Sequence, residues 1–164
     1  MVETGLSSRV ELPTVADTEA FGARLGAVCG PGDLVLLAGP LGAGKTALTR
    51  GIGAGLGVTG QVASPTFVIA RVHQPGPAGR ATLVHVDAYR LGGELELDDL
   101  DLDTELEHAV LVIEWGEGLA ERLAEEHLLL RLERRDDDVR IATLAPSGES
   151  WESRVRELTA ATGA

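Results

Sequence analysis

The residues best suited to chemistry lie in one short glycine-rich segment. Residues 39–46 read Gly-Pro-Leu-Gly-Ala-Gly-Lys-Thr, which fits the pattern G-x-x-x-x-G-K-[ST] of a phosphate-binding loop. Glycine lets the backbone turn so that successive N–H groups point at a β-phosphate, and a lysine here spans the β- and γ-phosphates. The Thr46 hydroxyl would ligate Mg²⁺. Lys45 is the only lysine in the chain, and a plain glycine turn would need neither it nor Thr46. We therefore predict a P-loop that binds Mg-ATP.

Two carboxylates could complete this site. Apolar runs at residues 83–86 and 110–113 end in Asp87 and Glu114. Because open α/β sheets bind ligands at the carboxyl ends of their strands, both acids should reach the phosphate edge. One would hold Mg²⁺ and its waters and the other would orient the attacking water; the spacing does not decide which, and a strand-end acid can also belong to a turn. The predicted catalytic residues are Lys45, Asp87 and Glu114, and the predicted metal ligands are Thr46, Glu114 and Asp87.

Apolar patterns predict the elements that position these residues. The continuous apolar run 34–38 indicates a parallel strand covered on both faces, directly before the loop. An apolar residue every fourth position predicts a helix over 45–57, although its glycines at 51, 53 and 55 leave its length open. Further strands are expected at 9–12, 67–73, 82–87 and 110–114, an antiparallel hairpin at 127–134 and 139–144, and further helices after Thr14 and around Trp151, Val155 and Leu158.

This alternation of strands and helices predicts one α/β domain over residues 1–164. The expected architecture is a single-domain P-loop NTPase, with a mostly parallel central sheet flanked by helices and an antiparallel C-terminal hairpin. The single cysteine, Cys29, falls on the apolar face of the first helix with Phe21, Leu25 and Val28. A core position is therefore expected for it, not the role of a reactive thiol.

Composition restricts the partners and the compartment. The 164 residues include 26 acidic and 14 basic ones, for a net charge of −12. Such a surface repels phosphate backbones, and no basic cluster offsets it, so the chain alone should not bind nucleic acid tightly. No leader-like N-terminus or membrane-length apolar run appears, so a cytoplasmic protein with no membrane contact is expected. Residues 94–107 hold eight acids, typical of a solvated helical face, with a docking surface for a basic partner as the alternative.

Four motifs together resemble one family. Residues 85–90 fit H-x-D-x-Y-R, residues 64–67 fit S-P-T-[FY], and residues 113–115 read Ile-Glu-Trp at the end of a strand. With the loop, in this order and spacing, they resemble the TsaE family (also called YjeE), small bacterial ATPases of the tRNA threonylcarbamoyladenosine pathway. The likeness extends from about Thr18 to Trp115. Each motif apart from the loop is weak alone, whereas the four together are specific.

The resemblance implies a function that depends on partners. Its cofactors would be ATP and Mg²⁺, and its partner a TsaB–TsaD-type complex that modifies an adenosine next to the anticodon. ATP hydrolysis would reset that complex between cycles without driving the transfer, and tRNA would be met only through the complex. Two positions depart from the family pattern: Pro40 stands where an aspartate is usual, and Ala47 replaces a common second threonine. Neither removes the N–H groups of the loop.

The resemblance also extends the set of nucleotide-binding residues. Residues 42–47 would wrap the phosphates, residues 64–67 would form a switch-like loop near the γ-phosphate, and residues 13–18 would lie near the adenine. Thr46 and Glu114 would be nearest Mg²⁺, with Asp87 close behind. The complete set expected to bind the cofactor is Gly39, Leu41, Gly42, Ala43, Gly44, Lys45, Thr46, Ala47, Thr18, Thr66 and Trp115.

Other interpretations remain open at several positions. His85 alternates with Asp87 and so shares its sheet face, where it could tune a carboxylate or could equally be packed beneath the site. Arg90 could anchor a loop, pair with an acid or act as an arginine finger. A small-molecule P-loop kinase is the alternative function, although no arginine-rich lid segment is evident. A GTPase would need N-K-x-D, and the chain has no asparagine and no second lysine.

Overall fold

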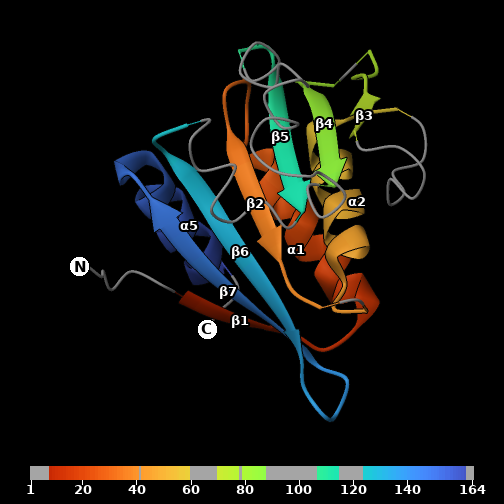
Figure 1. Ribbon diagram of the computed structural model, residues 1–164, viewed down its shortest axis with the longest axis vertical. Helices are drawn as coiled ribbons and strands as arrows, with labels where there is room; N and C mark the ends of the chain where they lie inside the picture. The colour runs from red at the N-terminus through yellow and green to blue at the C-terminus, as the bar shows by residue number, and fades with distance from the viewer. Residues whose placement is uncertain are drawn as a thin grey trace.

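The computed structural model describes residues 8–40, 42–59, 70–77, 79–87, 107–114 and 124–161. Within this part, seven strands form one sheet, with three helices beside it (Figure 1). None of the described helices is both long and apolar enough to cross a membrane. The strands, in sheet order, are β1 (Ser8–Leu12), β7 (Arg140–Ser147), β6 (His127–Arg134), β2 (Leu34–Ala38), β5 (Ala109–Glu114), β4 (Thr82–Asp87) and β3 (Ala70–His73).

The expectation of a mostly parallel central sheet is confirmed for the central strands but not for the edges of the sheet. The central strands β6, β2, β5 and β4 pair in parallel, but β1–β7, β7–β6 and β4–β3 are antiparallel, so the described sheet is mixed. The reason lies in the connections. Residues 74–81 between β3 and β4 are too few for a parallel crossover, which takes a dozen or more residues. At the opposite edge, β1 extends the predicted β6–β7 hairpin by pairing with β7.

The three helices share one core with one face of the sheet. They are α1 (Val15–Ala27), α2 (Lys45–Leu56) and α5 (Glu149–Ala161). A single buried cluster joins their apolar residues to side chains of β1, β2, β4, β5, β6 and β7, and Figure 1 shows all three helices behind the sheet. The opposite face of the central strands is buried as well, and all five residues of β2 are inaccessible, as its apolar run predicted.

The first helix begins where the sequence predicted it, directly after Thr14. The Thr14 hydroxyl accepts a hydrogen bond from the Asp17 amide, and Asp17 in turn accepts from the Thr14 amide, which completes a capping box at the start of α1. Helix α1 ends before Cys29, but that residue is still buried, and burial is the main reason that the pKa of its thiol rises to about 12. Its assignment to the core is confirmed.

Glycines bring α1 and α2 unusually close together. A Cβ atom on any of four glycines would strike a backbone carbonyl oxygen of the facing helix. The glycines are Gly22, Gly26, Gly51 and Gly55, and the oxygens belong to Leu48, Ile52, Glu19 and Ala23, respectively. The glycines that made the length of α2 uncertain are therefore its contact surface, and tertiary packing offsets their low helix propensity.

The substitution Gly51→Ala should destabilise the protein. We expect the free energy of unfolding to fall by about 1–3 kcal/mol, because overpacking against backbone atoms outweighs the gain in helix propensity. Thermal or denaturant unfolding of the purified variant measures this change. Gly30→Ala is the matched control, since no heavy atom lies within 4 Å of the added carbon there. Equal stability of the two variants would show that the helices can separate at no cost.

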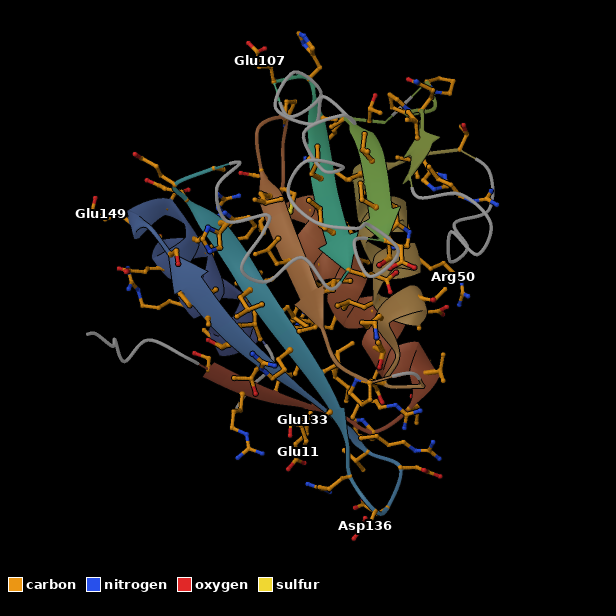
Figure 2. All side chains as sticks on the ribbon, viewed as in Figure 1. Glu11, Arg50, Glu107, Glu133, Asp136 and Glu149 are labelled. Carbon is orange, nitrogen blue, oxygen red and sulfur yellow. The ribbon has the colours of Figure 1, made fainter. Side chains whose placement is uncertain are left out.

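The β6–β7 hairpin projects beyond the sheet, and Figure 2 shows Asp136 at its tip. Ion pairs order this end of the hairpin. Arg134 binds Asp138, whereas Arg135 binds both Asp137 and Glu11 of the neighbouring strand β1. The turn end of the hairpin is therefore tied to β1 at the edge of the sheet, next to the start of α1.

Candidate functional site

The loop between β2 and α2 has the backbone geometry that its glycines predicted. Gly39, Gly42 and Gly44 have φ values of 143°, 80° and 104°, a region that other residues rarely adopt. A Cβ atom on Gly39 would strike the carbonyl oxygen of Leu132, so the loop runs directly against β6. Gly44 caps α2 without any side-chain hydrogen bond. The first amides of α2 therefore lack a side-chain cap, which is the arrangement of an anion site at a helix N-terminus.

Lys45 begins α2 and folds back over this loop. Its ammonium group donates to the carbonyl oxygens of Gly39, at 2.5 Å, and Pro40, at 3.2 Å. Burial lowers the pKa of Lys45, whereas the negative charges of Glu114 and Asp87 raise it. Both carboxylates therefore lie within electrostatic reach of the ammonium group, as the strand-end pattern predicted.

The sheet register explains how the two carboxylates come together. Asp87 and Glu114 are direct partners in the parallel pairing of β4 with β5. Glu114 is also the partner of Leu37, the residue before the last of β2. Because aligned residues of parallel strands point to the same face, both acids leave the sheet beside the loop that follows β2. Thr46 lies half-buried in the first turn of α2.

Glu114 has a buried partner on the neighbouring strand, His85, whose role the sequence left open. Its Oε2 lies 2.5 Å from Nε2 of His85, and the residues are 6% and 0% exposed. The sequence placed His85 on the face of Asp87 and left its role open between tuning a carboxylate and packing. The structure shows that its ring contacts the carboxylate on the next strand.

A cavity of about 290 Å³ adjoins the loop. It lies between the start of α1, the first turn of α2 and the turn end of the β6–β7 hairpin. Its lining residues are Pro13, Thr14, Val15, Thr18, Gly44, Ala47, Arg134, Asp138 and Arg140. The segment 13–18 was expected next to a nucleotide base, and four of its residues, Thr18 among them, line this cavity.

The hairpin residues of the cavity were missed by sequence reasoning. Arg134 donates to the Asp138 carboxylate at 2.6 and 2.9 Å, and Arg140 donates to the Asp138 carbonyl oxygen at 2.7 Å. The Arg140 side chain also lies about 4 Å from where a Cβ atom on Gly44 would be. The only signal in the sequence was the density of arginine and aspartate around residues 134–140, which was interpreted as a turn.

Comparison with known proteins identifies the family. A family model described as "Threonylcarbamoyl adenosine biosynthesis protein TsaE" matches residues 12–142. The chain belongs to the TsaE family. The match covers most of the chain and includes the loop, both carboxylates and most of the hairpin that lines the cavity.

Individual TsaE relatives are similar over most of their length. Proteins named "tRNA threonylcarbamoyladenosine biosynthesis protein TsaE" from Mycobacterium tuberculosis and Streptomyces coelicolor are each 56% identical over 139 and 136 residues, respectively. These matches cover 80% of this chain and 83% and 91% of the relatives. The Bacillus subtilis protein of the same name is 38% identical over 144 residues, 87% of this chain and 88% of that protein. The crystal structure of YdiB from B. subtilis superposes with a TM-score of 0.78 at 31% identity, covering 99% of this chain and 98% of that one.

The described residues of this TsaE chain suit an ion such as Mg²⁺, which is bound partly by water and phosphate. They do not suit a metal that is bound by protein ligands alone. No group of three or more His, Cys, Asp or Glu residues gathers in the described ranges. Mg²⁺ needs no such group, because it keeps several waters and is usually bound through one or two carboxylates plus phosphate oxygens. Thr46, Glu114 and Asp87 supply that kind of donor set next to the loop, and the geometry leaves open which carboxylate would bind the ion directly.

Some predicted residues of the TsaE site lie outside the described part of the chain. These are Leu41, Thr66 and Trp115, together with the segment 64–67, Tyr89, Arg90 and all of the acidic stretch 94–107 except Glu107. Their roles stay predictions. The structure brings the others together at one end of the sheet: Gly39, Gly42, Ala43, Gly44, Lys45, Thr46 and Ala47 on the loop and α2, Asp87 and Glu114 on neighbouring strands, and Thr18 on α1.

Proposed function

We propose that this chain is an ATPase required for threonylcarbamoyladenosine formation in tRNA, acting with a TsaB–TsaD-type complex and not transferring the threonylcarbamoyl group itself. The observation that carries the proposal is the position of Lys45. It lies beside a loop whose glycines have positive φ values, and within electrostatic reach of Glu114 and Asp87. Family membership adds the pathway, because the relatives are named for threonylcarbamoyladenosine biosynthesis in tRNA.

The chain's own residues divide the work of hydrolysis. The amides of the loop and of the first turn of α2 would bind the phosphates, and Lys45 would leave the carbonyl oxygens of Gly39 and Pro40 to contact them. Thr46 and one carboxylate would hold Mg²⁺, which when bound neutralises charge on the phosphates. The other carboxylate would orient the attacking water. Phosphoryl transfer depends mostly on positioning and electrostatic stabilisation. These residues therefore supply the types of group that ATP hydrolysis needs.

Lys45→Ala tests the phosphate site directly. Charge-assisted hydrogen bonds are worth about 1.5–3 kcal/mol, so ATP binding should weaken about 10- to 150-fold. Titration calorimetry of the purified variant measures this loss. Arg50→Ala, which removes an exposed charge from the same helix, should bind as the wild type does. Unchanged affinity in Lys45→Ala would refute the phosphate site.

The role in tRNA modification is tested in the host. Depletion of the protein should lower the threonylcarbamoyladenosine content of total tRNA, measured by mass spectrometry of digested nucleosides. Re-expression of the wild-type chain or of Arg50→Ala should restore it, and Lys45→Ala should not. Normal tRNA modification after depletion would exclude the proposed pathway for this chain.

The adjoining cavity has the size and lining for a nucleoside. Val15 is 60% exposed at its edge, although large apolar side chains are normally covered. A base that packs on Val15 would bury that surface, and the polar groups of Thr14, Thr18 and the hairpin would meet its edges and the ribose. We therefore place the adenosine here, on the side of Gly44 and Ala47.

Val15→Ala should weaken ATP binding roughly 3- to 10-fold, because up to two carbons lose their contact with the base. Binding of inorganic tripolyphosphate, which lacks a base, should not change. Competition titrations with the two ligands separate the effects. The matched control is Val72→Ala, since Val72 is similarly exposed (54%) but lies on the edge strand β3. An equal loss for both ligands would show that the cavity does not hold the base.

A further inference from the structure

We propose that His85 is a positioning residue: its Nε2–H donates to Oε2 of Glu114 and fixes that carboxylate so that its other oxygen is directed to Mg²⁺. The inference rests on the proposed function, because it assigns Glu114 as the carboxylate that binds the ion. It also goes further, since it gives a role to a residue outside the loop, the metal ligands and the cavity.

The strand register puts the two side chains within reach. His85 is aligned with Val112 in the parallel pairing of β4 and β5, and Glu114 follows two residues later on the same face. A long side chain can span this diagonal between neighbouring strands. His85 therefore contacts the Glu114 carboxylate from the interior of the protein. Lys45 lies within electrostatic reach of the same carboxylate.

Burial makes this contact specific. The His85 ring is inaccessible, and the Glu114 side chain is only 8% exposed. A buried carboxylate needs a hydrogen-bond donor, and an ionised carboxylate oxygen can only accept. Nε2 must therefore carry the hydrogen. No described group pairs with Nδ1 of the ring, so the tautomer with hydrogen on Nε2 alone also avoids burying a second, unpaired N–H.

The geometry leaves one carboxylate oxygen for the ligand. Oε2 is engaged by His85, so Oε1 is the oxygen that can turn to a bound ion without breaking the buried contact. Hydrogen bonds from outer residues commonly orient the ligands of a metal in this way. Apolar residues occupy the neighbouring positions on this face, Leu83 and Val112, and would pack there without fixing a carboxylate.

Two amide substitutions at His85 separate positioning from packing. In His85→Gln the side-chain amide nitrogen reaches about as far as Nε2 and keeps a donor for Glu114. In His85→Asn it ends near the place of Nδ1 and cannot reach Glu114. The readout is the ATP dissociation constant from calorimetry, measured once with Mg²⁺ and once with EDTA, together with the thermal midpoint of each variant.

We expect Mg²⁺ to lower the ATP dissociation constant of the wild type. In His85→Asn this Mg²⁺-dependent gain in affinity should be about 10–100-fold smaller. Its affinity in EDTA should stay near the wild-type value, which also reports an intact fold. His85→Gln should recover most of the Mg²⁺ effect. Glu114→Gln should lose the effect, and the double variant His85→Asn/Glu114→Gln should lose no more than Glu114→Gln alone, because His85 acts through Glu114.

The contrary outcomes are distinct. If Glu114→Gln loses the Mg²⁺ effect but His85→Asn keeps it, the His85 assignment is wrong and the proposed function stands. The same conclusion follows if His85→Gln loses as much as His85→Asn, or if the double variant loses more than Glu114→Gln. If the wild type binds no ATP at all, the proposed function fails and the inference falls with it.

Discussion

Glu114→Gln and Asp87→Asn should each slow ATP hydrolysis by about a hundredfold or more and leave much of the Mg²⁺-independent nucleotide binding intact. The two carboxylates are register partners on neighbouring strands, and both act electrostatically on Lys45. Each amide keeps the size of the side chain but removes the charge that would hold the ion or orient the water. The loop amides and Lys45, which would bind the phosphates, are untouched by either change.

Phosphate release under saturating ATP measures this effect, and calorimetry supplies the affinities. Glu149→Gln is the matched control for Glu114→Gln, because Glu149 is exposed at the start of α5, at the end of the sheet opposite the loop. It should hydrolyse ATP at the wild-type rate. A carboxylate whose amide variant turns over ATP normally is not part of the site.

The second large effect is the response to the partner. The isolated chain should hydrolyse ATP well below the roughly 1–100 s⁻¹ that is typical of kinases. An arginine that stabilises the transition-state charge is worth about 10³–10⁵ in rate. Two described arginines near the loop, Arg134 and Arg140, are engaged with Asp138 at the cavity. We therefore expect a TsaB–TsaD-type complex to complete or order the site and to raise the rate, by up to about 10³-fold if it supplies such a group.

The assay measures phosphate release and modified adenosine together, with each component left out in turn. Many rounds of tRNA modification should occur only when the complex, this chain and hydrolysable ATP are all present. The chain alone should not bind tRNA tightly at physiological salt, because its net charge is −12. If the complex does not change the rate of ATP hydrolysis and a small metabolite is phosphorylated instead, the kinase interpretation replaces the ATPase interpretation.

Much of the site could be predicted from the sequence because its signals are local. The loop pattern specifies consecutive residues, and left-handed backbone at Gly39, Gly42 and Gly44 follows from the need to turn between a strand and a helix. Asp87 and Glu114 were found because each ends an apolar strand, and strand ends meet at one edge of a parallel sheet. The capping box at Thr14 is likewise a pattern of adjacent residues.

Other features depended on which distant segments meet, and only the tertiary structure decided them. Periodicity gave no sign that Gly51 and Gly55 are contact residues, because their meaning depends on the facing carbonyl oxygens of α1. The partner of His85 depended on the relative register of β4 and β5, which alternation within one strand does not contain.

The cavity is the clearest case. Arg134, Asp138 and Arg140 are far from Thr18 and Gly44 along the chain, and they meet only because β6 pairs with β2 while β1 pairs with β7. The sequence by itself determined the glycine-rich loop between a strand and a helix, the two strand-end carboxylates and the family, since these rest on short patterns of consecutive residues. The mixed sheet, the support of Glu114 and the walls of the cavity were decided by strand order and register, because those contacts form between segments that no local pattern connects.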